Sequence, residues 1–289
     1  MDEYRESLHD GYGQMLAVDE LLYEGDTGQQ QLMVFRNRRF GRVMALDGVV
    51  QTTEADEFVY HEMLAHVPLL AHGGVRRVLV IGVGDGGILR ELTRHAGIRE
   101  IIGVEIDAQV VELCRRLLPS HSAGALDDPR LRLVYADGLD YLANSRESFD
   151  LIVCDSTDPG GPAASLFSDA FYRNCQQRLS EDGILVTQNG VPFLQPEELS
   201  GTARRLMENF ADWGFFHAAV PTYVGGSMCF GWGSNSPRAR ATDLATLRQR
   251  LHDSGLATRY YNAEVHQAAF ALPQYMRALV DAGMSGAGS

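Results

Sequence analysis

Carboxylates follow four consecutive apolar segments of this chain, each close to the point where the segment ends. The four are Asp85 in the glycine loop GVGDGG, Glu105 in EID, Asp137 in DG, and Asp155 in DSTDPGGPA. Carboxylates can accept protons, bind sugar hydroxyls and pair with cationic amines. Four of them after successive segments, together with a glycine loop, indicate a site rather than a solvated surface.

The glycine loop, residues 82–87, lies between an apolar strand pattern and a helical one. Loops of this kind usually hold an anionic group at a helix N-terminus, where a carboxylate such as Asp85 would repel it. The spacing G-x-G-x-G-G also departs from the dinucleotide-binding pattern G-x-G-x-x-G. Both observations argue against a pyrophosphate ligand.

The other carboxylates suggest a nucleoside and a reacting group. Glu105 could accept hydrogen bonds from two ribose hydroxyls, and Asp137 from the exocyclic amine of adenine. Each has a plainer interpretation, a solvated acidic loop for Glu105 and a turn-forming Asp-Gly pair for Asp137. Asp155 and Asp158 place two carboxylates at the mouth of one strand, and a simple turn does not explain an Asp155 that directly follows LIVC.

Alternating strand and helix patterns must position these groups. Helical stretches such as AQVVELCRRLL separate apolar runs, which predicts βαβ units and a sheet covered on both faces. We therefore expect a doubly wound, mostly parallel, Rossmann-like α/β sheet whose site lies at the carboxyl ends of its strands. The expected strands are 77–82, 100–106, 131–136, 149–155 and 183–189.

The chain before this part has a different pattern. Residues 31–53 alternate apolar and polar side chains and are interrupted at turn-forming residues, which predicts short antiparallel strands. Residues 57–70 have helical spacing and are followed by AHGG, a good helix end. We expect an N-terminal β-strand domain at residues 1–66 and a Rossmann-like catalytic domain at residues 67–289.

Composition limits the classes of protein that the chain can be. Its 289 residues are 45% hydrophobic and 22% charged, with a net charge of −13, which is unlike disordered chains. The negative charge disfavours nucleic acid or an anionic membrane as a partner and suits cationic small molecules. With an acidic start, no long apolar run and four scattered cysteines, we expect a cytoplasmic protein with reduced thiols.

Two familiar catalytic arrangements are absent from the sequence. In YHEMLAH, His61 and His66 are five residues apart, about 140° around a helix, whereas the zinc-protease pattern needs a spacing of four. No G-x-S-x-G motif supports Ser-His-Asp chemistry. We therefore expect no metal site.

Longer motifs carry a family resemblance. In order along residues 5 to 280, the chain resembles the polyamine aminopropyltransferases, the family of spermidine synthase. The motifs are LDGVVQTTEADEFVYHEML, GVGDGG, VEID, DG at 137–138, DSTDPGGPA, PTYVGG and RYYNAEVHQAAFALP. Val83 and Ala164 depart from residues common in the family, and neither replaces a group with an assigned role.

The resemblance implies a fold and a reaction. A small antiparallel β domain would precede a methyltransferase-like doubly wound domain, assembled as homodimers or homotetramers. The aminopropyl group of decarboxylated S-adenosylmethionine would pass to putrescine, giving spermidine and 5′-methylthioadenosine. The decarboxylated donor is then a co-substrate, and no other cofactor is implied.

The resemblance also implies a role for each matching residue. Asp155, Tyr60 and Tyr223 would be catalytic, and His61, Asp85 and Asp158 would contact the polyamine. The donor, or methylthioadenosine, would be bound by Gln30, Asp85, Glu105, Asp137, Gly138 and Pro162.

The glycine-loop aspartate then has a physical explanation. The decarboxylated donor has lost the carboxylate of the intact one and keeps a protonated amine, so Asp85 would attract the first and repel the second. Other acceptors, namely cadaverine, agmatine or spermidine, stay open. So do a methyltransferase that uses intact S-adenosylmethionine and a non-catalytic polyamine-binding protein, because the fold alone does not decide function.

Overall fold

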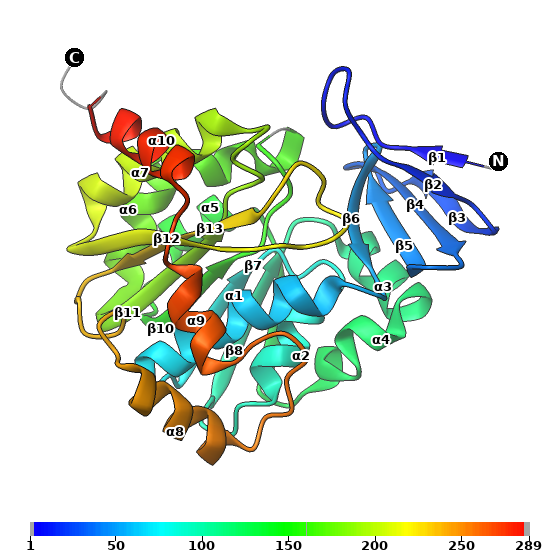
Figure 1. Cartoon of the computed structure of the whole chain (residues 1–289). Coiled ribbons are helices and arrows are strands. Elements are labelled where there is room, and N and C mark those ends of the chain that lie inside the picture. The colour runs from blue at the N-terminus through cyan, green and yellow to red at the C-terminus, as the bar shows by residue number, and fades with distance from the viewer. Residues whose placement is uncertain (1–2, 160, 286–289) are drawn as a thin grey trace.

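The computed structural model describes residues 3–159 and 161–285, except for the side chain of Pro162 (Figure 1). The N-terminal part contains a two-stranded sheet of β1 (Glu3–Arg5) and β2 (Met15–Ala17). An antiparallel four-stranded sheet follows in the order β3-β4-β5-β6. Its strands are β3 (Glu20–Asp26), β4 (Gln31–Asn37), β5 (Gly41–Leu46) and β6 (Val49–Thr53).

Short polar turns make these strands antiparallel neighbours, as the sequence predicted for residues 31–53. Between β4 and β5, the side chain of Asn37 accepts hydrogen bonds from the backbone amides of Arg39 and Phe40 at 2.9 and 3.0 Å. Between β5 and β6, Asp47 and Gly48 both have positive φ, 48° and 80°. A two-residue hairpin turn of type I′ requires positive φ at both of its central residues.

The second part is built on a seven-stranded sheet with the order β12-β13-β11-β10-β7-β8-β9. The five predicted strands are present and parallel to one another, although β11 begins at Leu179 rather than at residue 183. The sequence analysis missed β12 and β13, which extend the sheet antiparallel. The strands are β7 (Arg77–Ile81), β8 (Glu100–Glu105), β9 (Leu131–Tyr135), β10 (Phe149–Cys154), β11 (Leu179–Gln188), β12 (Asp212–Ala218) and β13 (Met228–Ser234).

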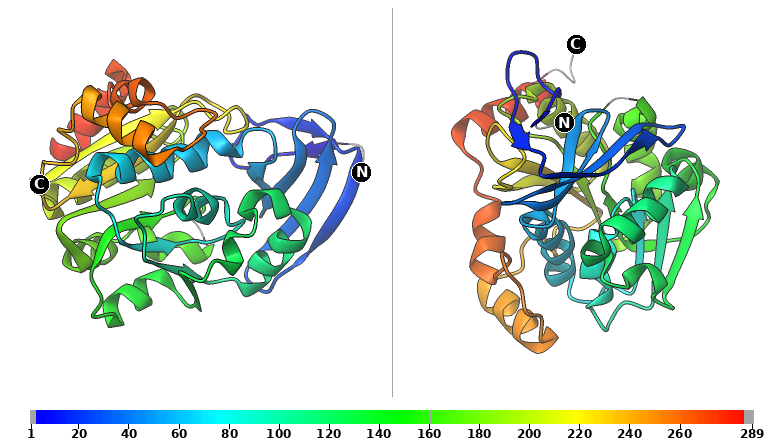
Figure 2. Two further views of the ribbon diagram at one scale, coloured as in Figure 1. Left: turned by 90° about the horizontal axis from the view of Figure 1, so that it is seen from below. Right: turned by 90° about the vertical axis from the view of Figure 1, so that its right-hand side faces the viewer.

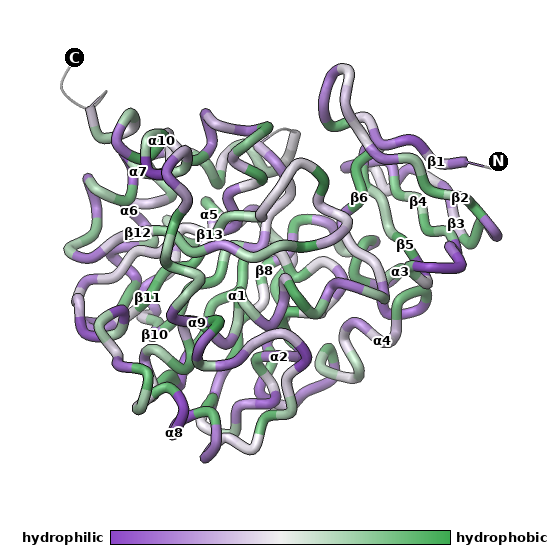
Figure 3. Tube along the Cα trace, viewed as in Figure 1, coloured by the Kyte–Doolittle hydropathy of each residue, from purple (hydrophilic) through white to green (hydrophobic). Residues whose placement is uncertain are grey.

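Helices cover both faces of this sheet, which confirms the doubly wound fold class. Along β7, Val78 and Val80 pack in one core cluster while Leu79 and Ile81 pack in another, because successive strand residues point to opposite faces. Figure 3 shows hydrophobic stretches along strands of the sheet. The first face carries α1 (Glu57–His72), α2 (Gly87–Thr93), α8 (Leu244–Ser254) and α9 (Ala263–Ala269), and the second α5 (Gly138–Asn144), α6 (Asp169–Arg178), α7 (Pro196–Asn209) and α10 (Gln274–Ser285).

Helix α3 (Ala108–Leu117) joins the two parts of the molecule (Figure 2). Its apolar side chains Val110, Leu113 and Cys114 form one buried cluster with Leu32 of β4 and Met44 of β5. The N-terminal sheet is therefore packed against the larger unit and not merely tethered to it. Short segments complete the chain, namely α4 (Pro119–Ser122) and the 3-10 helices η1 (Ala125–Asp127) and η2 (Gly161–Phe167).

The boundary that we expected after residue 66 falls inside α1. This helix begins at Glu57, directly after Asp56, and it packs on β10 and β11 of the large sheet. The change from β to α/β structure thus comes at about residues 54–57, and we propose the domain boundary there.

The strand order places the site. From β7 the chain adds β8 and β9 on one side of the sheet, and it then returns to place β10 on the other side of β7. In open α/β sheets, ligands bind in the crevice beyond the carboxyl ends of the strands at this reversal. Across the described ranges, no helix is long and apolar enough to cross a membrane.

Candidate active site

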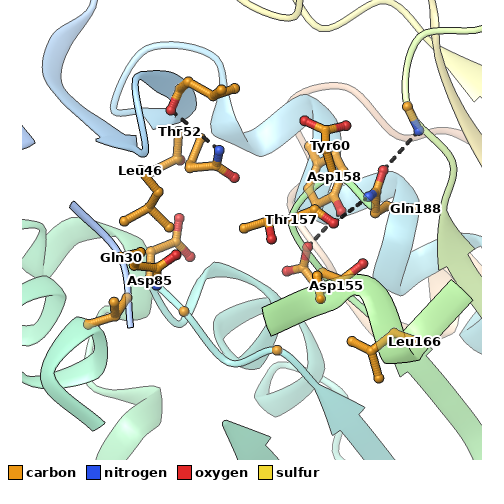
Figure 4. A pocket seen from close by; sticks show the side chains of 18 of the residues that line it. Gln30, Leu46, Thr52, Tyr60, Asp85, Asp155, Thr157, Asp158, Leu166 and Gln188 are labelled. Atoms are coloured by element: carbon orange, nitrogen blue, oxygen red, sulfur yellow. Dashed lines mark hydrogen bonds between the residues drawn. The ribbon is translucent and has the colours of Figure 1, made fainter. Parts of the chain in front are cut away.

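One pocket lies at the reversal point between the carboxyl ends of β7 and β10, and residues of the N-terminal sheet line it as well (Figure 4). The structure brings together around it almost every residue that the sequence analysis singled out. Pro162 lies in η2, and its side chain is outside the described residues. The expected residues that line the pocket are Gln30, Tyr60, His61, Asp85, Glu105, Asp137, Gly138, Asp155, Asp158 and Tyr223.

Asp155 lines the pocket directly after the end of β10. The hydroxyl of Tyr60, on α1, donates a hydrogen bond of 2.6 Å to its Oδ1 (Figure 4). Burial raises the pKa of Asp155 to about 6, although His61 and the Tyr60 hydroxyl both favour the charged form. Asp155 can therefore exchange a proton close to neutral pH.

Two tyrosines border this carboxyl group. The rings of Tyr60 and Tyr223 meet edge to face, with 5.8 Å between centroids. The Tyr223 hydroxyl donates to the backbone carbonyl of Gln51 at 2.6 Å. Burial and the nearby Asp155 raise the pKa of both phenols well above the ordinary value. Both hydroxyls consequently stay protonated and orient neighbours rather than accept protons.

Asp85 faces two imidazoles. Its Oδ1 accepts from the amide of Gly87 at 2.7 Å and lies 3.6 Å from Nε2 of His61, while its Oδ2 lies 3.7 Å from Nε2 of His121. Burial alone would raise the pKa of Asp85, but the two histidines lower it overall. The glycine-loop aspartate is thus held in its charged form.

His61 belongs to a chain of charges that runs away from the pocket. Its Nδ1 bonds to Glu57 at 2.6 Å, and both carboxylate oxygens of Glu57 accept from Arg90, at 3.0 and 2.8 Å. Burial disfavours the imidazolium, yet Asp85 and Glu57 raise the pKa of His61 to about 9. A protonated His61 therefore forms an ion pair with Asp85 at the pocket wall.

Glu105 holds the glycine loop as well as facing the pocket. Its Oε2 accepts from the amides of Val83 and Gly84 at 2.9 and 3.0 Å, and its Oε1 accepts from the amide of Asp107 at 3.0 Å. Asp107 caps α3 and also accepts from Nε2 of Gln30 at 3.4 Å. Oε1 thus keeps a lone pair for a ligand hydroxyl, whereas both lone pairs of Oε2 accept from the loop amides.

Asp137 combines the two interpretations that the sequence left open. Its Oδ1 accepts from the amide of Asp140 at 3.0 Å and so caps α5, which begins at Gly138. Its Oδ2 accepts from the hydroxyl of Ser165 at 3.3 Å. The same residue is therefore a helix cap and part of the pocket wall.

Two glutamines that the sequence analysis missed hold the segment after Asp155. Gln188 donates to the carbonyl of Thr157 at 3.1 Å, and Gln195 donates to Oδ1 of Asp158 at 2.7 Å. Gln188 ends β11, so inspecting that strand end as closely as the others would have found it. Gln195 directly precedes α7, the buried His121 lies in the short helix α4, and neither residue carries a sequence signal of its own.

The pocket wall is predominantly negative. No arginine is among the lining residues that the structure describes. The lining contains six carboxylates, namely Glu6, Asp85, Glu105, Asp137, Asp155 and Asp158. This wall suits cationic ligands and disfavours phosphates. In the described part of the chain, no cluster of three or more His, Cys, Asp or Glu is arranged to hold a metal ion.

Comparison with known proteins identifies the family. Residues 57–243 match the spermine/spermidine synthase domain, and residues 3–54 match the spermidine synthase tetramerisation domain. The chain belongs to the spermine/spermidine synthase family. It is thus an enzyme of the polyamine aminopropyltransferases, and the match of residues 3–54 supports assembly into an oligomer.

Relatives match this aminopropyltransferase over nearly its whole length. Polyamine aminopropyltransferase 1 of Pseudomonas aeruginosa is 59% identical over 276 residues, 96% of each chain. The polyamine aminopropyltransferase of Pseudomonas syringae pv. tomato is 56% identical, also over 96% of each chain. A crystal structure of spermidine synthase in complex with the transition-state analogue AdoDATO has a TM-score of 0.92 at 35% identity, covering 96% of this chain and 94% of that one. Spermidine synthase from Thermotoga maritima has a TM-score of 0.90 at the same identity and coverage.

The two departures from the family pattern lie outside the pocket lining. Val83 is buried in the core on the first face of the sheet, and it contributes its backbone amide to Glu105. Ala164 lies in η2. Neither substitution removes a polar group from the aminopropyltransferase site.

The backbone of Gly82, the first residue of the glycine loop, lies too close to Asp155 to leave room for a side chain. Gly82 has φ +83°, and a Cβ there would overlap the carbonyl oxygen of Asp155, whereas Gly84 has φ +46° and open space around it. Gly84→Ala should cost about 1 kcal/mol of unfolding free energy from backbone strain, and Gly82→Ala about 1–3 kcal/mol more from the overlap. Urea unfolding at one protein concentration measures both, and equal losses would contradict this contact.

Proposed function

We propose that this aminopropyltransferase transfers the aminopropyl group of decarboxylated S-adenosylmethionine to putrescine, producing spermidine and 5′-methylthioadenosine. The observation that carries the proposal is the partly buried Asp155, held by Tyr60 and poised to exchange a proton near neutral pH, in a wall of carboxylates. Such a wall suits a cationic donor and a cationic diamine. Relatives named polyamine aminopropyltransferase and spermidine synthase support it.

The reaction is a displacement at the carbon next to a sulfonium. The attacking amine nitrogen forms a bond to that carbon while the carbon–sulfur bond breaks, and neutral methylthioadenosine leaves with the electron pair. The sulfonium is already a good leaving group, so the protein must mainly supply a free amine in the correct orientation. No metal or further cofactor takes part in this proposal.

Asp155 is the proposed proton acceptor. Putrescine amines are protonated at neutral pH, so one proton must leave before or during attack. The Asp155 carboxylate accepts it, and the hydroxyls of Tyr60 and Tyr223 orient the attacking nitrogen. Asp158 holds the distal ammonium of the acceptor. Tyr60 also keeps Asp155 in place through the bond of 2.6 Å.

The donor occupies the opposite end of the pocket in this proposal. Glu105 faces the ribose hydroxyls and accepts through Oε1, Asp137 accepts from the adenine amine, and Gly138 lets the ring approach the backbone. Gln30 closes the adenosine site from the N-terminal sheet, and Pro162 borders it. Asp85 pairs with the aminopropyl ammonium, and His61 keeps Asp85 charged.

Acceptor identity is tested by turnover. Purified enzyme and decarboxylated donor are incubated separately with putrescine, cadaverine, agmatine and spermidine, and products are measured by mass spectrometry. We expect the highest kcat/KM with putrescine. A higher kcat/KM with another amine would show that this amine, and not putrescine, is the preferred acceptor. Methyl transfer from intact S-adenosylmethionine would contradict the proposed reaction itself.

The oligomer is proposed to be a homodimer or homotetramer. The match of residues 3–54 to the tetramerisation domain supports this assembly. Sedimentation equilibrium measures the mass directly. A mass of one chain at micromolar concentration would contradict the proposal.

Replacing the proposed base gives a kinetic prediction. Asp155→Asn should lower aminopropyl transfer by about 10²–10⁴-fold, because a positioned proton acceptor is lost. Methylthioadenosine affinity, measured by calorimetry, should stay nearly unchanged, since the proposed adenosine contacts lie elsewhere. Because Asp155 must be deprotonated to accept a proton, wild-type kcat/KM should fall as the pH drops through about 6. If the transfer rate of the variant were within a few-fold of the wild-type rate, Asp155 would not be the proton acceptor.

Donor selection gives a binding prediction. Asp85→Asn should weaken binding of the decarboxylated donor, because the ion pair between its ammonium and Asp85 is lost. It should strengthen binding of intact S-adenosylmethionine, because the donor carboxylate no longer faces a charged Asp85. Unit charges a few Å apart at an effective dielectric near 20 interact by about 4 kcal/mol. Since the protonated His61 already compensates Asp85, we expect about a tenfold change in the affinity ratio, roughly 1.4 kcal/mol. Competition binding of the two donors measures the ratio, and an unchanged ratio would mean that Asp85 only shapes the loop.

A further inference from the structure

The end of the pocket lined by Asp158 contains a hydrogen-bonded bridge that the proposed chemistry does not use. Nε2 of Gln195 donates to Oδ1 of Asp158 at 2.7 Å and to Oε1 of Glu198 at 2.8 Å. Oε1 of Gln195 accepts from the backbone amide of Val191 at 2.8 Å. Both amide hydrogens and the carbonyl oxygen of Gln195 thus have partners, so its orientation is fixed.

Asp158 depends on this bridge for its own orientation. Across the described residues, Gln195 is the group that donates a hydrogen bond to the Asp158 side chain. Gln195 and Asp158 both line the pocket, whereas Glu198 lies behind Gln195 and outside the lining. Without the bridge, the Asp158 carboxylate could rotate among its side-chain conformations.

Glu198 is placed so that it holds Gln195 and adds little charge. Its Oε2 is buried without a hydrogen-bond partner in the described part of the chain, a costly position for a charged oxygen. Burial, together with Asp158, raises the pKa of Glu198 to about 8. A protonated Glu198 still accepts from Gln195 through Oε1, and it places no second negative charge beside Asp158.

We propose that Gln195 and Glu198 are positioning residues that orient Asp158, and that they thereby set the affinity and chain-length preference for the acceptor amine. The proposal rests on the proposed function, in which Asp155 takes the reacting amine and Asp158 the distal one. Two carboxylates at a fixed separation select an acceptor whose nitrogens match that separation. A mobile Asp158 relaxes the match.

If Glu198 only stabilised the N-terminus of α7, its replacement should have the same effect as replacement of another carboxylate in that turn. Glu198 lies in the first turn of α7, where any carboxylate favours the helix N-terminus. Glu197 lies in the same turn and is exposed, and among the described residues its side chain forms no hydrogen bond with Gln195, Asp158 or Glu198. Glu197→Ala is therefore the matched control for Glu198→Ala.

The experiment measures steady-state kinetics with saturating decarboxylated donor and with putrescine or cadaverine as acceptor. Glu198→Ala should raise the putrescine KM about tenfold, the scale of one lost hydrogen bond in a network with a charged group. Its kcat and donor KM should stay within about twofold, and its kcat/KM preference between the two diamines should shrink several-fold. Glu198→Gln keeps an acceptor oxygen for Gln195 and should stay close to wild type, as should Glu197→Ala.

Gln195→Leu tests the same proposal independently, and it does so even if Glu198→Ala does not fold. It should raise the putrescine KM at least as much as Glu198→Ala with kcat retained, and the double variant should be no worse than Gln195→Leu, because both act through Asp158. Equal effects of Glu198→Ala and Glu197→Ala, parallel changes in acceptor and donor KM, or an unchanged diamine preference would overturn the proposal. A wild-type enzyme inactive with every amine acceptor would overturn the proposed function instead.

Discussion

The hydrogen bond between Tyr60 and Asp155 is the interaction on which the rest of the site depends. It joins α1, the first helix of the α/β part, to the end of β10 at the point where the strand order reverses. Burial pushes the pKa of Asp155 upward, and the Tyr60 hydroxyl limits that rise by favouring the charged form. The result is a carboxyl group that is oriented and can still take up a proton near neutral pH.

The distribution of charge around this group explains how a pocket can stay acidic inside a folded protein. Arg90 lies outside the lining and compensates the wall through the chain Arg90–Glu57–His61, which ends at Asp85. Backbone amides compensate Glu105, and Gln195 compensates Asp158. The carboxylates are thus stabilised without an arginine among the lining residues that the structure describes, so their outward faces remain available to amines.

The sequence was sufficient for features that depend on order along the chain. Alternating elements predicted the parallel strands, and the rule for strand ends brought Asp85, Glu105, Asp137 and Asp155 to one pocket. Features that depend on neighbours distant in sequence were not predictable in this way. His121 reaches Asp85 from α4, and β12 and β13 join the sheet by antiparallel pairing that no nearby repeat announced. The cap made by Asp137 and the loop contacts of Glu105 show that a binding residue can also hold its own backbone.

The ionisation of Asp155 is the most direct test of this account, because base strength, burial and the Tyr60 bond all act on that one carboxyl group. Carbon-13 NMR of protein labelled at the aspartate carboxyl carbons, with Asp155→Asn to assign the signal, follows its titration in the free enzyme. The account predicts a pKa of about 6 in the wild type and a higher pKa in Tyr60→Phe, where the stabilising hydroxyl is gone. An ordinary aspartate pKa of about 4, unaffected by the loss of the Tyr60 hydroxyl, would contradict it.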